Sequence, residues 1–251
     1  MQLDPPPNLS AAALFVDVDG TLLEIAPTPH AVRVEPELTA LLRSLLLATS
    51  GALALVSGRS IAELDALFLP LTLPAAGLHG FERRGASGSY ECRRLPPAPA
   101  LEQARRALLE LADQHPGLLV EDKRFSLAMH YRRAPHLGSV VVRAMTDIAA
   151  GVRPEFELQM GKMVAELRPA GSTKGAAVAE FMTEHPYRGR LPIYIGDDLT
   201  DESAFEWVNG VGGLSIAVNV SGATAARERL PDVTAVRAWL AQARGPSSLN
   251  R

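Results

Sequence analysis

The sequence predicts an α/β protein, a doubly wound parallel sheet into which a second, smaller α+β domain is inserted. Three observations predict this fold class. Up to about residue 75, short apolar runs of strand length alternate with stretches whose leucines recur at helical spacing. The same alternation resumes from about residue 172. Between these parts, after the proline-rich residues 96–99, the predicted order becomes helix, strand, strand, helix, strand, strand, which is typical of a compact α+β unit.

The first part of the chain alternates strand and helix. In order, we expect a buried strand at 11–16, a helix at 35–49, a buried strand at 52–56, a helix from 61 to about 68, a strand at 75–78 and a hairpin at 81–95 that turns at 85–88. Gly51 ends the first helix, and Ser60 with Glu63 fits a capping box that begins the second.

The remaining elements fall into the insert and the closing part. In the insert we expect helices at 100–114 and 137–150 and strands at 118–123, 126–131, 155–159 and 163–167. In the closing part we expect a helix from 173 to about 182, a strand at 192–196, a helix from Thr200 to about 208, a strand at 214–218 and closing helices. The two flanking parts share one pattern, and each has few strands. We therefore expect a discontinuous core, residues 1–96 and 168–251, with the inserted domain at 97–167.

Composition limits the class of protein. The 251 residues are 47% hydrophobic and 21% charged, as in an ordinary globular protein, and the net charge of -3 gives no basic footprint for nucleic acid. The single Cys92 excludes an internal disulfide, and no Cys/His cluster suggests zinc. We found neither a charged signal-peptide start nor a segment of about 20 apolar residues. We expect a cytoplasmic protein, monomeric, with no membrane or nucleic-acid partner.

The most informative motif is acidic and follows the first strand. It reads Asp17-Val18-Asp19-Gly20-Thr21. Side chains alternate along a strand, so Asp17 and Asp19 point the same way, towards the sheet edge where α/β proteins bind ligands. Gly20 permits a sharp turn and leaves its amide available to an anion. A solvated acidic turn is the alternative interpretation.

A second acidic cluster follows the strand at 192–196. Asp197 and Asp198 come directly after it, and Asp201 and Glu202 lie in the first turn of the next helix, where they can simply complement the helix dipole. Acidic pairs at two strand ends of one sheet suggest a hard cation with oxygen ligands, and Mg²⁺ is the expected ion.

Two further segments offer partners for a phosphate. Ser57 lies in Ser57-Gly58-Arg59 after the second strand, and Lys174 lies at a helix start, where free amides favour anions. Taken singly, the first is commonly a turn and the second is commonly a solvated lysine.

The order DxDGT, SGR, Lys-Gly at a helix start, then GDD, each after an apolar strand, resembles the haloacid-dehalogenase superfamily of phosphohydrolases. The resemblance implies that Asp17 attacks phosphorus to form an aspartyl-phosphate, and that Asp19 protonates the departing alcohol and later deprotonates water. It also implies Mg²⁺ held by Asp17, Asp197 and the carbonyl of Asp19, with Asp198 supporting the metal. The phosphate-binding residues it implies are Gly20, Thr21, Ser57, Gly58 and Lys174.

The insert resembles the cap of trehalose-6-phosphate phosphatases. The resemblance is carried by Glu121-Asp122-Lys123, His130-Tyr131-Arg132, residues 161–169 and Gly77-Leu78-His79-Gly80, and it extends to residues 224–230. It implies a phosphosugar substrate and sugar contacts from Glu121, Lys123, Glu166, Arg59 and His79. By spacing alone, Glu121 and Lys123 lie on one strand face and read as an exposed ion pair.

Other functions remain as alternatives. Another capped sugar phosphatase would act on sucrose phosphate or a glycosyl-phosphoglycerate. A signalling receiver domain also pairs an acceptor aspartate with acidic metal ligands and a lysine, but it lacks an acid at the position of Asp19 and has no cap. A catalytically silent sugar-phosphate sensor would share the fold, although every reacting residue is present here.

Overall fold

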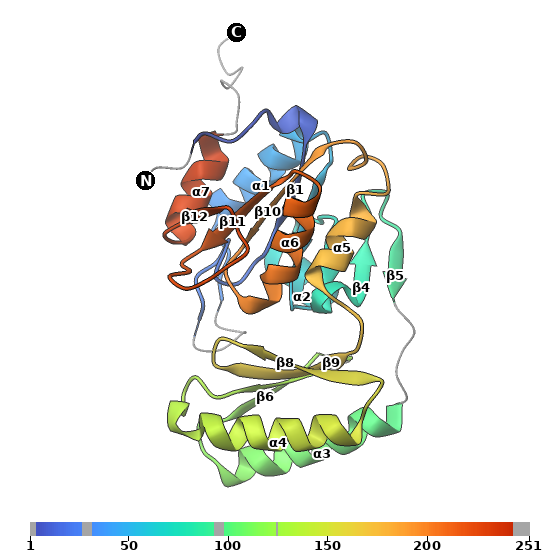
Figure 1. Ribbon diagram of the computed structural model, residues 1–251, viewed down its shortest axis with the longest axis vertical. Helices are drawn as coiled ribbons and strands as arrows, with labels where there is room; N and C mark the ends of the chain where they lie inside the picture. The colour runs from blue at the N-terminus through green and yellow to red at the C-terminus, as the bar shows by residue number, and fades with distance from the viewer. Residues whose placement is uncertain (1–3, 27–31, 93–97, 124, 243–251) are drawn as a thin grey trace. The chain divides into compact units, whose positions relative to one another are not determined.

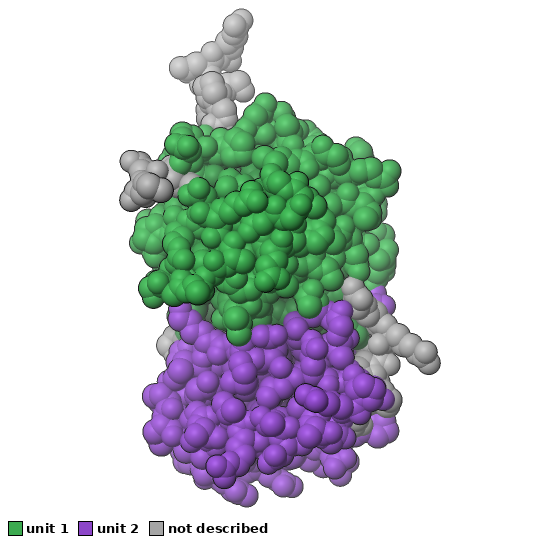
Figure 2. Space-filling model, in the orientation of Figure 1, with its two compact units in different colours: residues 1–91, 173–251 green, residues 92–172 purple. Residues whose placement is uncertain are grey.

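The computed structural model describes residues 4–26, 32–92, 98–123 and 125–242. The chain forms two compact units (Figure 2). One comprises residues 1–91 and 173–251, and the other comprises residues 92–172. The sequence-based boundaries, at 96/97 and 167/168, lie a few residues from these.

The first unit contains a sheet with the order β12-β11-β10-β1-β2-β3-β4-β5 (Figure 1). Neighbouring strands run parallel from β12 to β3, and β4 is antiparallel to β3. The strands are β1 (Ala12–Val16), β2 (Leu53–Val56), β3 (Ala75–Gly77), β4 (Glu82–Arg84), β5 (Tyr90–Cys92), β10 (Leu191–Gly196), β11 (Leu214–Val218) and β12 (Glu228–Leu230). The predicted α/β class with a mainly parallel sheet is confirmed.

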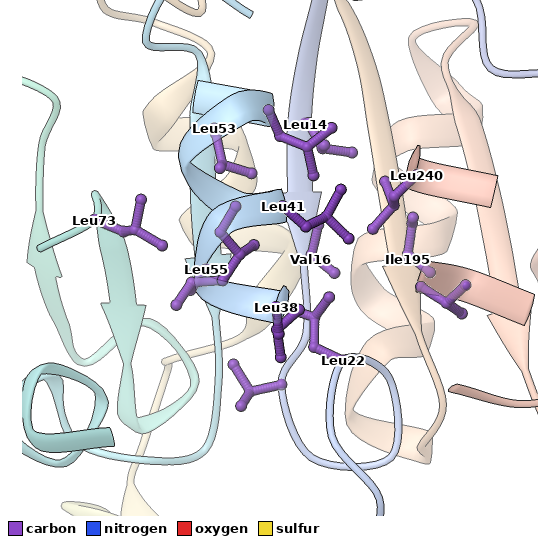
Figure 3. Close-up of a cluster of buried hydrophobic side chains, with 14 of the residues drawn as sticks. Leu14, Val16, Leu22, Leu38, Leu41, Leu53, Leu55, Leu73, Ile195 and Leu240 are labelled. Carbon is purple, nitrogen blue, oxygen red and sulfur yellow. The ribbon is translucent and has the colours of Figure 1, made fainter. Parts of the chain in front are cut away.

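Helices cover both faces of this sheet. They are α1 (Pro36–Ala48), α2 (Ile61–Phe68), α5 (Lys174–Phe181), α6 (Glu202–Gly210) and α7 (Val233–Gln242). Alternate residues of the strands divide between two cores. Leu14 and Val16 of β1 belong to the core under α1, α2 and α7, whereas Phe15 belongs to the core under α5 and α6. Figure 3 shows Leu38 and Leu41 of α1 among the side chains of β1 and β2. The continuous apolar runs in the sequence thus reflect strands buried on both faces.

Most elements lie within a few residues of their expected ranges, and the capping box at Ser60 is confirmed, with Ser60 N donating to Glu63 Oε2 at 2.7 Å. Two expectations were wrong. The helix expected to be capped by Thr200 begins instead with a 3₁₀ turn over Leu199–Asp201 that Asp198 caps. The strand β12 was missed because its three residues, two of them charged, show no apolar run.

The second unit is a four-stranded antiparallel sheet with two helices. Its strand order is β6-β7-β9-β8. The elements are α3 (Ala98–Gln114), β6 (Leu119–Asp122), β7 (Leu127–His130), α4 (Gly138–Gly151), β8 (Phe156–Gly161) and β9 (Val164–Pro169). Leu127, Met129 and Leu167 face a core shared with α3 and α4. Polar residues alternate with them, so the other face of the sheet is polar.

The connections around β1 determine where the first unit can bind a ligand. β1 lies between β2 and β10, which come from opposite parts of the chain. The chain leaves β1 for α1 on one face and leaves β10 for α6 on the other. The loops that follow these two strands therefore diverge at their carboxyl ends, which is the usual ligand-binding position of an open α/β sheet.

Within the residues that the structure describes, no helix combines the length and apolar character needed to cross a membrane.

Candidate active site

The DxDGT segment forms a tight loop directly after β1. The amide of Asp17 still donates to Ile195 O of β10 at 2.9 Å, and Gly20 N donates to Leu23 O at 2.7 Å. Gly20 has a φ of +85°, and a Cβ atom there would lie 2.0 Å from Asp197 Oδ2. Only glycine therefore lets the loops after β1 and β10 approach this closely.

Lys174 reaches the same place from the first turn of α5. Thr173 caps this helix by accepting from Ala176 N at 3.1 Å. Lys174 Nζ lies 3.0 Å from Asp17 Oδ1 and 2.7 Å from Asp201 Oδ1, and its side chain is 2% exposed. Burial alone would lower the pKa of Lys174, but the charges of Asp17 and Asp201 outweigh burial and raise that pKa above its ordinary value. The side chain is therefore an ammonium that faces two carboxylates.

Three buried carboxylates converge around this lysine. One oxygen each of Asp17, Asp197 and Asp201 lies within 4.8 Å of the others. Two like charges about 4 Å apart repel by roughly 4 kcal/mol at an effective dielectric of 20. Burial, Asp201 and Asp197 raise the pKa of Asp17 well above its ordinary value, although Lys174 and the amide of Val18 act in the opposite direction. Hard oxygen donors that repel one another in this way fit a divalent cation.

Asp201 acts within this cluster as an organising residue. Its Oδ1 accepts from Lys174 Nζ and from Tyr194 Oη at 2.6 Å, and its Oδ2 accepts from the amides of Asp197 and Asp198 at 3.0 and 2.9 Å. A carboxylate has about four lone-pair positions, and these four donors use them. Asp17 and Asp197 are therefore better placed than Asp201 to offer ligand atoms to a cation.

Two residues expected at the metal lie outside this buried cluster. Asp198 is only partly buried, and its Oδ1 caps the following turn by accepting from Leu199 N at 2.7 Å. The carboxylate of Asp19, whose backbone carbonyl is the group expected at the metal, pairs with Arg59, with Nε to Oδ2 and Nη2 to Oδ1 both at 2.6 Å.

The Ser57-Gly58-Arg59 loop follows β2, next to β1 in the sheet. Ser57 is buried, its amide donates to Ala76 O at 2.9 Å, and its Oγ accepts from Arg59 N at 3.1 Å. A Cβ atom on Gly58 would lie 2.9 Å from the ring of His79. His79 has a φ of 57°, a left-handed conformation that is uncommon for a residue other than glycine. The segment around His79 thus packs against this loop, and the imidazole ring leaves room only for glycine at position 58.

The polar face of the second unit carries a connected network. Glu121, Ala128, Glu166 and Gln159 form one row across the four strands. His130 Nε2 lies 2.7 Å from Glu121 Oε2. Glu166 accepts from Ser126 Oγ at 2.7 Å and from Lys123 Nζ at 3.2 Å.

Glu121 is electrostatically distinct in this network. Burial alone would raise its pKa, but the hydrogen bond from His130 and the charge of Lys123 outweigh burial, so the pKa of Glu121 is lowered. The polar face therefore presents an ionised carboxylate held by two partners.

Most of the residues selected from sequence gather in two places. In the first unit, the loops after β1, β2, β3 and β10, together with the start of α5, carry Asp17, Asp19, Gly20, Thr21, Ser57, Gly58, Arg59, His79, Lys174, Asp197 and Asp198. Glu121, Lys123 and Glu166 lie together in the second unit.

Sequence reasoning missed the roles of Asp201, Tyr194, Ser126 and His130. The spacing of Asp201 in GDDLTD was a usable signal, but a helix-dipole role explained it equally well. Tyr194 gave no signal, because a tyrosine in an apolar strand reads as core.

Comparisons with known proteins agree with this geometry. A family model described as trehalose-phosphatase matches residues 15–232. The chain is 44% identical over 239 residues to a trehalose-6-phosphate phosphatase of Escherichia coli K12, covering 95% of this chain and 89% of that one.

Among solved structures, the C-terminal domain of the Candida albicans trehalose-6-phosphate phosphatase superposes with a TM-score of 0.84 at 23% identity, over 94% of this chain and 92% of that one. A phosphatase of the haloalkanoate (HAD) superfamily from Bacteroides thetaiotaomicron superposes with a TM-score of 0.59 at 18% identity, over 95% and 96%.

The mainly parallel sheet with a separate small antiparallel unit is the fold that this chain shares with that HAD phosphatase. The family model that matches residues 15–232 and the identity to the bacterial enzyme show that the chain belongs to the trehalose-phosphatase family.

Proposed function

We propose that this protein is a Mg²⁺-dependent phosphatase that hydrolyses trehalose 6-phosphate to trehalose and inorganic phosphate. The observation that carries the proposal is that Asp17, Asp197 and Lys174 lie together where the loops after β1 and β10 diverge. The chain that holds this site belongs to the trehalose-phosphatase family. The site supplies a nucleophile, a cation-binding pair and a fixed positive charge, and phosphoryl transfer depends mainly on such positioning and electrostatics.

In this proposal, Asp17 is the nucleophile. One of its carboxylate oxygens forms a bond to phosphorus while the bond from phosphorus to the sugar oxygen breaks, which gives an aspartyl-phosphate. Asp19 donates a proton to the departing sugar oxygen and then accepts one from the water that attacks the phosphorus. As the water oxygen bonds to phosphorus, the bond from phosphorus to the Asp17 oxygen breaks, which releases inorganic phosphate and restores the Asp17 carboxylate. Lys174, already 3.0 Å from Asp17, holds the nucleophile in place and offsets the charge of the phosphoryl group.

Asp17 and Asp197 would hold Mg²⁺, with the backbone carbonyl of Asp19. When bound, the cation would offset the negative charge that these carboxylates share with the phosphoryl oxygens. Asp201 keeps Lys174 and the amides after β10 in position, and Asp198 supports the same loop through its cap. Thr21, Ser57 and Gly58 would add hydrogen-bond donors for the phosphate, but Gly20 would not, because its amide, expected from the sequence to be available to an anion, already donates to Leu23 O at 2.7 Å.

The second unit would supply sugar recognition, with residues 97–167 acting as a cap on the catalytic core. Glu121, Lys123 and Glu166 already form a connected set of charged donors and acceptors, which suits the hydroxyl groups of a neutral disaccharide. A wrong sugar would leave such groups without partners, and this supports discrimination between substrates. His79 is a further candidate for substrate contact.

We also propose that the enzyme works as a monomer in the cytoplasm and has no nucleic-acid partner. Cys92 is exposed and is the single cysteine of the chain, so it has no disulfide partner within the chain, which fits a reducing compartment.

Phosphate release from a panel of esters tests the proposed function. The panel contains trehalose 6-phosphate, sucrose 6-phosphate, a glycosyl-3-phosphoglycerate and glucose 6-phosphate, each with Mg²⁺ and with excess chelator. We expect trehalose 6-phosphate to have the highest kcat/KM and chelator to abolish turnover. The Asp17→Asn variant, prepared in parallel, should be inactive with an unchanged circular dichroism spectrum. A different best ester would contradict the sugar assignment, and activity in Asp17→Asn would contradict the nucleophile.

A further inference from the structure

The Asp19–Arg59 pair has a geometry that sugar contact does not explain. The edge of the guanidinium formed by Nε and Nη2 faces both carboxylate oxygens of Asp19 at 2.6 Å. Such a two-pronged, charge-assisted contact fixes the orientation of both groups as well as binding them. This edge of Arg59 is thereby committed to Asp19.

The two side chains differ in exposure in a way that fits a holder and a held group. The side chain of Arg59 is 10% exposed, whereas that of Asp19 is 35% exposed. The arginine is therefore enclosed by protein, while the carboxylate keeps a surface open to a reacting molecule.

The backbone of Arg59 is itself fixed from both sides. Its amide donates to Ser57 Oγ at 3.1 Å, and its carbonyl accepts from Leu78 N at 2.9 Å. The loop that carries Ser57, a proposed phosphate-binding residue, thus also determines where the guanidinium lies. A carboxylate that must face the leaving oxygen and later a water gains from such an anchor, because small displacements of a catalytic group are costly.

We propose that Arg59 is a positioning residue that aims the carboxylate of Asp19 at the leaving-group oxygen, and that it does not bind the sugar. The inference rests on the proposed function, because it takes Asp19 as the general acid and base. In this inference Arg59 acts on the reaction through Asp19. Its loss should therefore affect the steps that need proton transfer and spare substrate binding.

The test compares two leaving groups. A sugar alkoxide must be protonated as it departs, whereas 4-nitrophenolate leaves without a proton. We expect Arg59→Ala to lower kcat/KM for trehalose 6-phosphate by about 100-fold, within the range for loss of general acid catalysis, and kcat/KM for 4-nitrophenyl phosphate by less than about threefold. Arg59→Lys keeps the positive charge but lacks the planar guanidinium that binds both carboxylate oxygens, so it should recover only part of the activity on the sugar ester.

The chain offers a matched control. Arg84 also makes a two-pronged contact, with Asp65, through Nη2 and Nη1 at 2.6 and 2.7 Å, and the side-chain exposures are 14% and 39%. This pair links β4 to α2 and lies outside the proposed catalytic groups. Arg84→Lys should leave the ratio of the two kcat/KM values unchanged.

Two further measurements separate positioning from the other roles. In a double-mutant cycle, Arg59→Ala should cost no additional activity on the sugar ester once Asp19 is replaced by Asn. In the inactive Asp17→Asn background, Arg59→Ala should leave the Kd for trehalose 6-phosphate, measured by calorimetry, within about twofold.

Each contrary result overturns the inference. Equal losses on both esters would show that Arg59 only maintains the loop, and a Kd raised tenfold or more would show that it contacts substrate. Unchanged activity on both esters would show that Asp19 needs no such support. If the wild-type enzyme does not prefer trehalose 6-phosphate, the proposed function fails, while the same comparison on its best sugar ester still decides the role of Arg59.

Discussion

At the residue scale, the stability of the site depends on how Asp201 is satisfied. This carboxylate is completely buried and accepts four hydrogen bonds from Lys174, Tyr194 and two backbone amides. An ionised group in such a position is costly unless its partners are all present. Burial and the charge of Asp201 raise the pKa of Tyr194, which keeps the phenol protonated and able to donate.

Replacing Tyr194 by phenylalanine tests this dependence. The change removes one donor to a buried carboxylate and keeps the ring, so we expect it to lower the free energy of unfolding by about 1.5–3 kcal/mol. Urea denaturation with an unchanged m-value measures the loss.

Tyr187 provides the comparison. It is equally buried, and its Oη donates to the neutral Leu53 O at 3.2 Å, so Tyr187→Phe should cost only about 0.5–1.5 kcal/mol. If Tyr187→Phe lowers the free energy of unfolding as much as Tyr194→Phe or more, the hydrogen bond from Tyr194 does not stabilise the buried Asp201 carboxylate more than a bond to a neutral carbonyl would.

Functional residues could be predicted from the sequence where they come directly after a predicted strand. Asp17 and Asp197 could be selected because acidic side chains after apolar runs are costly without a role. The partners of a selected residue were not predictable in the same way. Arg59 was expected at the sugar, and only the fold brings its guanidinium against Asp19, 40 residues earlier in the chain.

At the element scale, side chains alternate between the two faces of the sheet of the second unit, so that one face forms a core and the other holds polar residues. One face packs on α3 and α4, and the other holds Glu121, His130 and Glu166 in adjacent strands. The lowered pKa of Glu121 comes from His130 and Lys123 acting against burial. The Glu121 carboxylate therefore contributes stability above its unfolded pKa near 4.5, and this contribution is lost as pH falls through the lower folded value.

Removing the imidazole should reverse the shift. In His130→Ala, burial is opposed by Lys123 alone, so we expect the pKa of Glu121 to rise, as followed by carbon-detected NMR titration of the side-chain carboxyl. His115→Ala, which removes an imidazole elsewhere in the same unit, should leave that pKa unchanged. A Glu121 pKa that stays the same in His130→Ala would show that Lys123 alone sets it.

Elements with a strong pattern were the ones that could be predicted. The leucines of α1 and the apolar runs of β1 and β10 fixed their ranges closely, because both faces of the sheet are buried. β12 was not predicted because a strand of three residues is too short to show a periodic pattern. Its pairing with β11, in which Ile216 is opposite Glu228, arises only in the folded chain.

At the scale of the whole molecule, the acidic cluster should couple cation binding to stability. Asp17, Asp197 and Asp201 repel one another, and a cation that binds only the folded chain stabilises it by mass action, by about 2.7 kcal/mol at 100 times its Kd. We expect Mg²⁺ to raise the Tm of the wild-type protein in calorimetry.

Asp197→Asn should remove the response to Mg²⁺. Because this variant also has one fewer charge in the cluster, its Tm without the cation should equal or exceed that of the wild type. The exposed Asp147→Asn on α4 should respond to Mg²⁺ like the wild type. An undiminished Mg²⁺ response in Asp197→Asn would place the cation elsewhere.

The pairing of β1 with β10 joins two segments that are synthesised at widely separated times, because they lie far apart in the sequence. Ala12 faces Leu191, whereas every strand and helix of the second unit lies within the unbroken stretch 92–172. A nascent chain therefore has the complete smaller unit before the central strand of the larger one receives its second neighbour, and contacts of long sequence separation form slowly. Synthesis arrested anywhere before residue 197 yields a chain that lacks Asp197, and the proposed mechanism predicts that this chain is inactive however well its smaller unit has folded.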